Sequence, residues 1–173
     1  MKAMTLVELT ITLMIAIGFT TIALPIFTES KRDAQLAAFA TEITAELATA
    51  RLYAQMSDRS VTMRFPSEGH LLFETKCGNV LLSSRRKRPR NSSHYPQLRL
   101  PDGAIDHPTS GQPIEEAFRT THGDRIIFGS NGSSSATLTF SMDRKRILCI
   151  VVSGSTGRFR AYLRSGSSWV PFQ

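Results

Sequence analysis

The distribution of apolar and polar residues changes twice along the chain. From Met4 to Leu24 nearly every residue is apolar or is Thr or Gly, and Glu8 carries the single charge. A helix of this length is just long enough to cross a hydrocarbon core of about 30 Å. Lys2 precedes it, where the positive-inside rule places cytoplasmic charge. The pattern therefore predicts a membrane-spanning helix over 4–24.

Two simpler explanations of this segment are a secretory signal peptide and a plain membrane anchor. The apolar run is longer than the roughly 7–15 residues of a signal-peptide core, and no small-x-small cleavage site closes it. A plain anchor leaves Glu8 unexplained, because a carboxylate inside an apolar span is costly and usually functional.

Beyond Pro25 the pattern becomes amphipathic. The proline lacks an N–H group and disturbs the preceding turn, which predicts a kink near Ala23–Leu24. No Pro or Gly interrupts 26–57, so we expect one helix from about Thr5 to about Met56. Apolar residues then recur at helical spacing and predict a stripe packed on a head domain: Leu36, Phe39, Ala40, Ile43, Leu47, Ala50 and Ala54.

After Asp58 the period changes to two, which indicates half-buried strands. Val61, Met63 and Phe65 begin this pattern. A helix followed by antiparallel strands is typical of an α+β architecture. We expect strands at 61–65, 70–75, 80–82, 98–100, 125–128, 136–140, 147–152 and 158–163, and long loops at 83–97 and 105–123.

Positive charge gathers in three places and gives the chain a net charge of +7. A balance this basic suggests a polyanionic partner. The first group is a loop (Arg86, Lys87, Arg88), the second a turn (Arg144, Lys145, Arg146), and the third a strand face (Arg158, Arg160, Tyr162, Arg164).

Side chains alternate between the two faces of a strand, so the third group shares one face, and Phe159, Ala161 and Leu163 are expected to face the core. Arg offers a forked donor for phosphate, and Tyr a plane on which a base can stack. For the strand face, the alternative to anion binding is a solvated surface whose Arg residues pair with acidic side chains. For the basic loop, the alternatives are that it only solubilises the chain or that it contacts anionic lipid.

The sequence predicts no catalytic, metal or cofactor site. It contains no HExxH, Walker A, GxSxG or paired Cys/His motif, and His70, His94, His107 and His122 lack ligand spacing. Cys77 and Cys149 are outside any CxxC pair, so either they form one disulfide in an exported head or each is a buried free thiol.

The N-terminus resembles the prepilin cleavage motif of type IV pilins and type II secretion pseudopilins, through Ala3-Met4-Thr5-Leu6-Val7-Glu8-Leu9. The resemblance implies that prepilin peptidase cuts between Ala3 and Met4 and that Met4 is N-methylated. It also implies that Glu8 pairs with the α-amino group of Met4 on a neighbouring subunit and sets the axial register. Ala3 and Met4 depart from the usual Gly and Phe.

The head resembles the GspH/FimT family of minor pilins and pseudopilins. The resemblance rests on Ile126-Ile127-Phe128 before Gly129-Ser130-Asn131-Gly132, and on Ile150-Val151-Val152 before Gly157-Arg158-Phe159-Arg160. It implies a pilin fold with a leader (1–3), a membrane and filament-core helix (4–24), an amphipathic helix (25–57) and a β-rich head (58–173). The middle of the chain, about 76–124, shows no family pattern.

Two functions follow from the resemblance. The first is a minor type IV pilin whose basic head binds double-stranded DNA non-specifically during uptake in natural transformation. The second is a purely structural minor pilin or type II pseudopilin that primes or caps a filament. Both functions imply other pilin subunits as partners. Both also imply a single-pass inner-membrane protein whose head lies in the periplasm or outside the cell, and which later becomes part of a pilus or pseudopilus.

Overall fold

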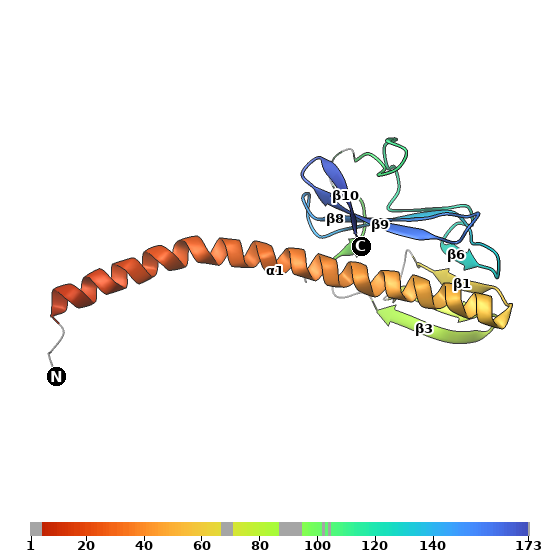
Figure 1. Cartoon of the computed structure of the whole chain (residues 1–173), viewed down its shortest axis with the longest axis horizontal. Coiled ribbons are helices and arrows are strands. Elements are labelled where there is room, and N and C mark those ends of the chain that lie inside the picture. Colours follow the sequence, from red (N-terminus) through yellow and green to blue (C-terminus); the bar gives the residue numbers. More distant parts are fainter. Residues whose placement is uncertain (1–4, 67–70, 87–94, 102, 104, 173) are drawn as a thin grey trace. The chain divides into compact units, whose positions relative to one another are not determined.

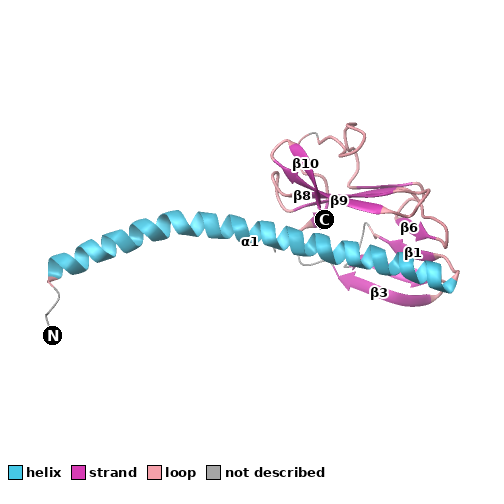
Figure 2. Cartoon of the chain, in the orientation of Figure 1, coloured by secondary structure: helices cyan, strands magenta, loops and turns pink. Residues whose placement is uncertain are grey.

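The computed structural model describes residues 5–66, 71–86, 95–101, 103 and 105–172. The chain divides into two compact units, residues 1–35 and 36–173. The helix α1 (Leu6–Ser57) begins in the first unit and ends in the second, and every strand lies in the second unit, the head (Figures 1 and 2).

The helix prediction is confirmed within one residue at each end. The α1 helix continues through Pro25 without a break and ends at Asp58, whose φ of 50° is left-handed, as is common at the residue that follows a helix. The buried residues of α1 are the seven of the predicted stripe: Leu36, Phe39, Ala40, Ile43, Leu47, Ala50 and Ala54.

The head contains two antiparallel sheets. Sheet A has the order β3-β2-β1-β6, and sheet B has the order β10-β9-β8-β7-β4, with β5 also paired to β7. The bounds are β1 Val61–Arg64, β2 Leu71–Cys77, β3 Val80–Arg86, β4 Gln97–Leu98, β5 Phe118–Thr120, β6 Arg125–Phe128, β7 Ala136–Ser141, β8 Ile147–Val152, β9 Phe159–Ser165 and β10 Ser168–Phe172.

One hydrophobic core joins the α1 stripe to both sheets. Sheet A contributes residues such as Met63 and Phe128, and sheet B contributes residues such as Leu138 and Ile150, all with no exposed surface. Phe39 of α1 lies edge-on to Phe140 of β7, with ring centroids 5.0 Å apart. The predicted α+β architecture of a long helix packed on antiparallel sheets is therefore confirmed.

The strand predictions were wrong in four places. The strand expected at 98–100 is β4, which covers only Gln97–Leu98. Strand β3 continues to Arg86 although 83–97 was expected to be loop, β5 lies inside the predicted loop 105–123, and β10 was not predicted. The polar end of β3 is held by pairing with β2, and by Arg85, which forms an ion pair with Glu42 of α1 and donates to the Tyr95 hydroxyl.

A strap, formed by the described residues of 99–117 (99–101, 103 and 105–117), covers part of the face of sheet B that points away from the main core (Figure 1). The Ser141 hydroxyl donates to Arg99 O at 3.2 Å, the Thr139 N–H to Ala117 O at 2.7 Å, and Trp169 Nε1 to Asp106 O at 2.7 Å. A second apolar layer lies on this face and includes the fully or almost fully buried residues Ile105, Ile147, Cys149 and Tyr162. The part of sheet B around Cys149 and Tyr162 is therefore buried on both faces, whereas Arg160 on the same face as Tyr162 is exposed.

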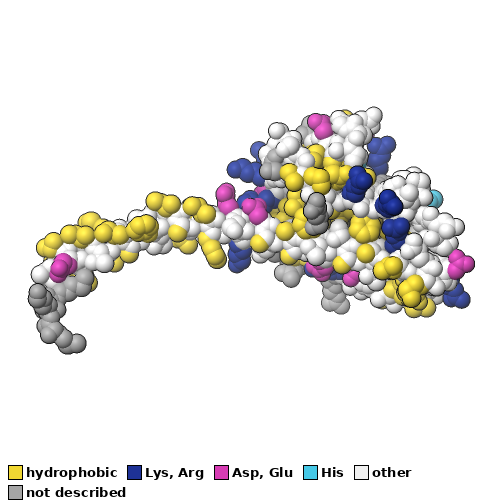
Figure 3. Space-filling view, viewed as in Figure 1, with side chains coloured by type: hydrophobic (Ala, Val, Ile, Leu, Met, Phe, Trp, Pro, Cys, Tyr) yellow, Lys and Arg dark blue, Asp and Glu magenta, His cyan; other side chains and the backbone are white. Residues whose placement is uncertain are grey.

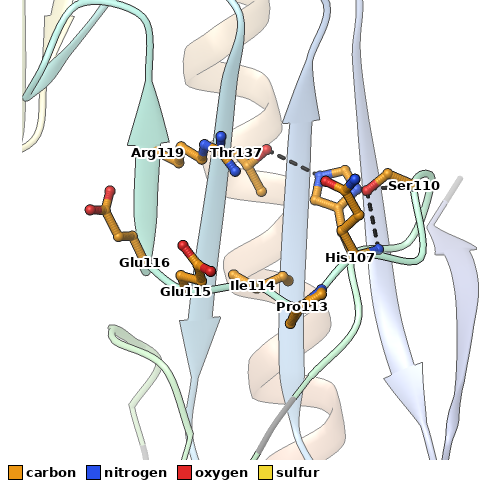
Figure 4. A pocket seen from close by; sticks show the side chains of 9 residues that line it. His107, Ser110, Pro113, Ile114, Glu115, Glu116, Arg119 and Thr137 are labelled. Carbon is orange, nitrogen blue, oxygen red and sulfur yellow. Dashed lines mark hydrogen bonds between the residues drawn. The ribbon is translucent and has the colours of Figure 1, made fainter.

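His107 attaches the strap to β7 beside a cavity of about 170 Å³. Figure 4 shows its ring directed toward Thr137, and Glu115, Glu116 and Arg119 also line this cavity. Nδ1 accepts from the N–H groups of Thr109 (3.3 Å) and Ser110 (3.4 Å), so the proton of the neutral ring is on Nε2, which lies 3.1 Å from Thr137 Oγ1.

Burial, and secondarily the Arg119 guanidinium, hold the pKa of His107 below its ordinary value of 6.5. The folded state therefore favours the neutral ring, and its contribution to stability is full above pH 6.5 and is lost as the pH falls toward the folded pKa. Protonation would also place an N–H donor at Nδ1 against two backbone donors.

We predict that the full chain in detergent loses stability between about pH 8 and about pH 5.5, and that His107→Gln removes most of this pH dependence. At the higher pH the variant should itself be destabilised by about 0.5–1.5 kcal/mol, the usual net contribution of a hydrogen bond, because the Thr109 and Ser110 N–H groups lose their acceptor. Unfolding in urea, followed by Trp169 fluorescence, measures both effects. The exposed His122, changed to Gln, is the control and should keep the wild-type pH profile. An unaltered profile in His107→Gln would contradict this assignment.

Candidate filament and anion-binding sites

The N-terminus of α1 is closed by a capping box. The Thr5 hydroxyl accepts from the Glu8 N–H at 3.3 Å, and Glu8 Oε2 accepts from the Thr5 N–H and the Thr5 hydroxyl, each at 3.0 Å. The Glu8 carboxylate thus satisfies the first turn of its own helix. Ala3 and Met4, the expected cleavage and methylation residues, lie outside the described residues.

In the apolar part of α1, threonine hydroxyl groups form hydrogen bonds within the helix. The hydroxyls of Thr10, Thr20 and Thr21 donate to backbone carbonyls three or four residues earlier, at 2.7–2.8 Å. Such bonds satisfy a hydroxyl where water is absent. The large apolar side chains are exposed along this segment, as Figure 3 shows for one face, and α1 contains a window long and apolar enough to cross a membrane.

Three arginines form a stripe that begins at Arg158, one residue before β9, and continues along the strand. Arg158 and Arg160 are exposed and Arg164 is half-buried. Their Cα atoms span about 20 Å of extended chain. None of the three pairs with a carboxylate of the described residues, while Arg164 Nε donates to Gly166 O at 3.1 Å.

Two predicted members of the basic surface do not belong to it. Tyr162 is only 8% exposed, because the strap covers the face of sheet B on which it lies, so the prediction that its ring is open to a base was wrong. The Arg146 side chain is 10% exposed and pairs with Asp143. Of the loop cluster, Arg86 is the last residue of β3, and Lys87 and Arg88 lie outside the described residues.

Asp143 shapes the turn between β7 and β8, which the sequence predicted. Burial raises the pKa of its carboxyl, but Oδ1 accepts from the N–H groups of Arg146 and Lys145, each at 2.9 Å, and Oδ2 accepts from Arg146 Nη1 at 3.0 Å. These bonds outweigh burial, and the pKa lies below its ordinary value. Arg144 and Lys145 remain exposed on the turn.

The sheet register separates the basic groups. Ala136 at the start of β7 pairs with Val152 at the end of β8, so the β6–β7 and β8–β9 loops meet at one end of sheet B. Arg158 lies at this end. The β7–β8 turn, with Arg144 and Lys145, lies at the other end, where Arg164 precedes the β9–β10 turn. Lys and Arg side chains accordingly appear toward both ends of the head on the face drawn in Figure 3.

Two glycine-rich loops, 129–135 and 153–157, pack backbone against backbone. The Ser133 N–H donates to Gly154 O at 3.0 Å, and the Gly154 N–H donates to Ser135 Oγ at 3.2 Å. A Cβ at Gly154 would lie 2.5 Å from Ser135 Oγ, and one at Gly132 would lie 2.9 Å from Gly154 O. Glycine is therefore required at both positions by the close approach of the loops.

Arg51 of α1 lies against these loops. Gly157 has a φ of +62°, and a Cβ placed there would be 3.4 Å from Arg51 Nε and 3.5 Å from the carbonyl carbon of Gly132. The sequence analysis missed Arg51, since nothing in its helical spacing separates it from other polar residues of α1. The signal that was available is the set of glycines at 132, 154 and 157, which indicates close approach of another element.

The two cysteines are free and buried. Cys77 ends β2 in sheet A, and Cys149 lies in β8 of sheet B opposite Thr139. Burial raises the pKa of the Cys149 thiol to about 12, so it is an inert thiol at neutral pH. The sequence left open a disulfide or two buried free thiols, and the structure contains the two buried free thiols.

Among the residues that the structure describes, no group of three or more His, Cys, Asp or Glu is placed to hold a metal ion.

A family model described as type II transport protein GspH matches residues 40–156. The chain belongs to the GspH family. Comparisons with curated proteins and with solved structures give no match. The matched residues cover five of the seven residues of the α1 stripe and the two glycine-rich loops of this GspH-family head except Gly157. They exclude the N-terminal motif and the arginine stripe on β9.

Family membership confirms the resemblance inferred from the sequence and gives the chain a role as a minor pilin or pseudopilin, a class of structural subunits that assemble with others. Because the match ends at residue 156, it carries no information about Arg158, Arg160 or Arg164. Any role of these residues has to be argued from the chemistry of this chain.

We predict that Gly154→Ala and Gly132→Ala each destabilise the head by about 1–3 kcal/mol, the usual cost of forcing extra atoms into a packed site. Unfolding of the full chain in urea provides the measurement. Gly129→Ala, in the same loop, is the matched control: its nearest non-neighbouring atom would be 3.8 Å from the new Cβ, and the change should stay within about 0.5 kcal/mol. Equal effects at 129 and 154 would contradict the close packing of the loops.

Proposed function

We propose that this GspH-family protein is a minor type IV pilin whose basic head binds duplex DNA without sequence preference during uptake in natural transformation. The observation that carries the proposal is the stripe of Arg158, Arg160 and Arg164 along one strand, unpaired with any described carboxylate. Guanidinium groups along about 20 Å can meet several phosphates of one duplex, whose charges recur every ~1.7 Å of helix axis.

The N-terminal segment supplies the means of assembly. The apolar part of α1 crosses the inner membrane, with Lys2 on the cytoplasmic side and the head in the periplasm. Prepilin peptidase removes residues 1–3, and Met4 is N-methylated. Before assembly the Glu8 carboxylate caps its own helix. In the filament it pairs with the α-amino group of Met4 of a neighbouring subunit, because a buried charge requires a partner.

The second candidate is a structural minor pilin or type II pseudopilin that primes or caps a filament and binds no DNA. The burial of Tyr162 and Arg146 favours it, because it removes a stacking platform and one cation from the predicted surface. On this alternative the stripe is a solvated strand face. The two candidates share the N-terminal segment and differ only in the head.

We predict that Glu8→Gln abolishes incorporation into filaments and leaves membrane insertion intact. Removing one partner of a buried ion pair costs about 3–5 kcal/mol, enough to exclude the subunit from a filament. Immunoblots of sheared filaments and of membranes measure the two pools. Glu46→Gln makes the same chemical change later on α1 and should assemble normally. Normal assembly of Glu8→Gln would refute the role of this carboxylate.

For DNA binding we predict a marked loss of affinity when Arg158, Arg160 and Arg164 are all changed to Gln. The slope of log K against log salt should become shallower by about 0.9 for each phosphate that the head no longer neutralises. Fluorescence anisotropy of a labelled duplex, titrated with the full chain in neutral detergent at several salt concentrations, provides both values.

The matched control changes Lys31, Arg59 and Lys76 to Gln. It removes the same number of charges, from +7 to +4, at residues outside β9. If both triple variants bind alike, attraction is due to net charge alone and the stripe has no specific part in it. If the wild-type chain does not bind duplex DNA at low salt, the DNA-binding proposal is refuted and the second candidate, a structural minor pilin or pseudopilin, is supported.

A further inference from the structure

We infer that the end of the head at the β7–β8 turn is a docking surface for the anionic phospholipid headgroups of the membrane that α1 spans. The surface consists of Arg99, Arg144 and Lys145, and we call it the basic turn cluster. The inference rests on the proposed membrane insertion of α1. It goes beyond the proposed function because it gives a second basic surface, separate from Arg158 and Arg160, a partner of its own.

The direction of β7 relative to the head's part of α1 places the turn. A Cβ at Gly157 would lie 3.4 Å from Arg51 Nε and 3.5 Å from the carbonyl carbon of Gly132, so Arg51 marks the level at which β7 begins. At the far end of the strand, the Phe140 ring lies 5.0 Å from that of Phe39. Strand β7 therefore runs opposite to α1, and the turn that follows it extends beyond Phe39 toward the N-terminal end of the buried stripe.

The Phe39 end of the head is also the end nearer, along the chain, to the apolar segment. Exposed large apolar side chains continue along α1 as far as Phe27, twelve residues before Phe39. Twelve helical residues span about 18 Å, which limits the tether at any angle between α1 and the membrane. Headgroups occupy about 5–8 Å of this length. Their attraction reaches about 8–10 Å further, so the tether keeps this end of the head within range of lipid charge.

Three exposed cations meet at the turn. Arg144 and Lys145 are part of the turn itself. The hydroxyl of Ser141, the last residue of β7, donates to Arg99 O at 3.2 Å, which brings the exposed Arg99 to the base of the turn. The cluster therefore draws on two segments, far apart in the sequence, that the sheet brings together.

The acid within the turn does not cancel these charges. Asp143 Oδ2 accepts from Arg146 Nη1 at 3.0 Å, so these two form an internally neutral pair. Asp143 Oδ1 accepts from the Lys145 and Arg146 N–H groups, each at 2.9 Å, which fixes the backbone on which the cations stand. A fixed backbone limits the entropy lost when the turn binds a surface. Asp106, exposed on the strap, leaves the cluster an excess of positive charge.

A lipid surface suits this cluster better than a duplex does. The arginine stripe starts with Arg158 at the opposite end of sheet B, whereas the cluster lies at the end that α1 tethers to the membrane. A tethered surface is present at high effective concentration. Each Lys or Arg close to an anionic leaflet favours the bound state by about fivefold, and this attraction requires no particular geometry of the headgroups. We therefore commit to lipid headgroups as the partner.

The test measures energy transfer from Trp169, the single tryptophan of the chain, to dansyl groups on lipid headgroups. Trp169 pairs with Arg164 at the same end of sheet B, and its Nε1 donates to Asp106 O at 2.7 Å, so it is a fixed reporter. The full chain is reconstituted in liposomes of phosphatidylcholine with or without phosphatidylglycerol. Transfer should be greater with phosphatidylglycerol, and the difference should shrink as salt is raised.

Changing Arg99, Arg144 and Lys145 together to Gln should remove the effect of phosphatidylglycerol. Three cations at about fivefold each amount to a loss of about a hundredfold in the docked population. Arg164 is left unchanged because it belongs to the proposed DNA-binding stripe. The salt titration of the wild type tests the inference even if this variant does not fold.

The matched control changes Arg59, Lys76 and Arg119 to Gln, which also lowers the net charge from +7 to +4. These residues lie toward the opposite end of the head. Arg59 follows the end of α1, Lys76 pairs with Thr62 near the start of β1, and Arg119 pairs with Thr137 near the start of β7. The control should keep the transfer of the wild type.

Each other outcome overturns the inference in a distinct way. Equal transfer in both lipids, or equal effects of the two triple changes, overturns the docking surface and leaves the proposed function standing. If the change at the turn leaves transfer unaltered but weakens duplex binding more than the control does, the cluster serves DNA and the lipid assignment is wrong. A chain that does not float with liposomes after carbonate extraction refutes the proposed membrane insertion, and the docking with it.

Discussion

Burial of a single helical stripe against two sheets holds the head together. Sheets A and B are separate hydrogen-bonded units, and both pack their apolar faces on the seven small and large apolar residues of α1. Three of these residues are alanines, which let the strands approach the helix closely. Without the stripe, each sheet would expose one apolar face to water. The same helix contains the window that is long and apolar enough to cross a membrane, so one element both organises the head and carries the candidate membrane span.

The stripe is also the part of the fold that the sequence predicted best. Its seven residues recur at helical spacing, and the spacing alone determines which face of α1 is buried. Strands β6, β7 and β8 were predicted to within one residue because they are apolar and bounded by Gly/Ser loops. Strands β5 and β10 were missed because short edge strands acquire their structure from their partners, and neither shows a strong alternation of its own.

The candidate site was harder to predict for a related reason. Alternation along 158–164 correctly assigned Ala161 to the core and Arg158 and Arg160 to the exposed side. It failed at Tyr162 because the strap that covers this residue comes from a segment some fifty residues earlier, without any pattern. Arg51 shows the converse case: its placement over Gly157 depends on tertiary packing, and only the glycines of the two loops hint at it.

The position of β9 within sheet B has a mechanical consequence. It is hydrogen-bonded to β8 on one side and to β10 on the other, so it is not the strand at the edge. If a polymer bound to its arginines were under tension while the filament retracts, the force would act on an interior strand and would be shared by two rows of hydrogen bonds. In an edge strand, which has one row, the hydrogen bonds can break one after another.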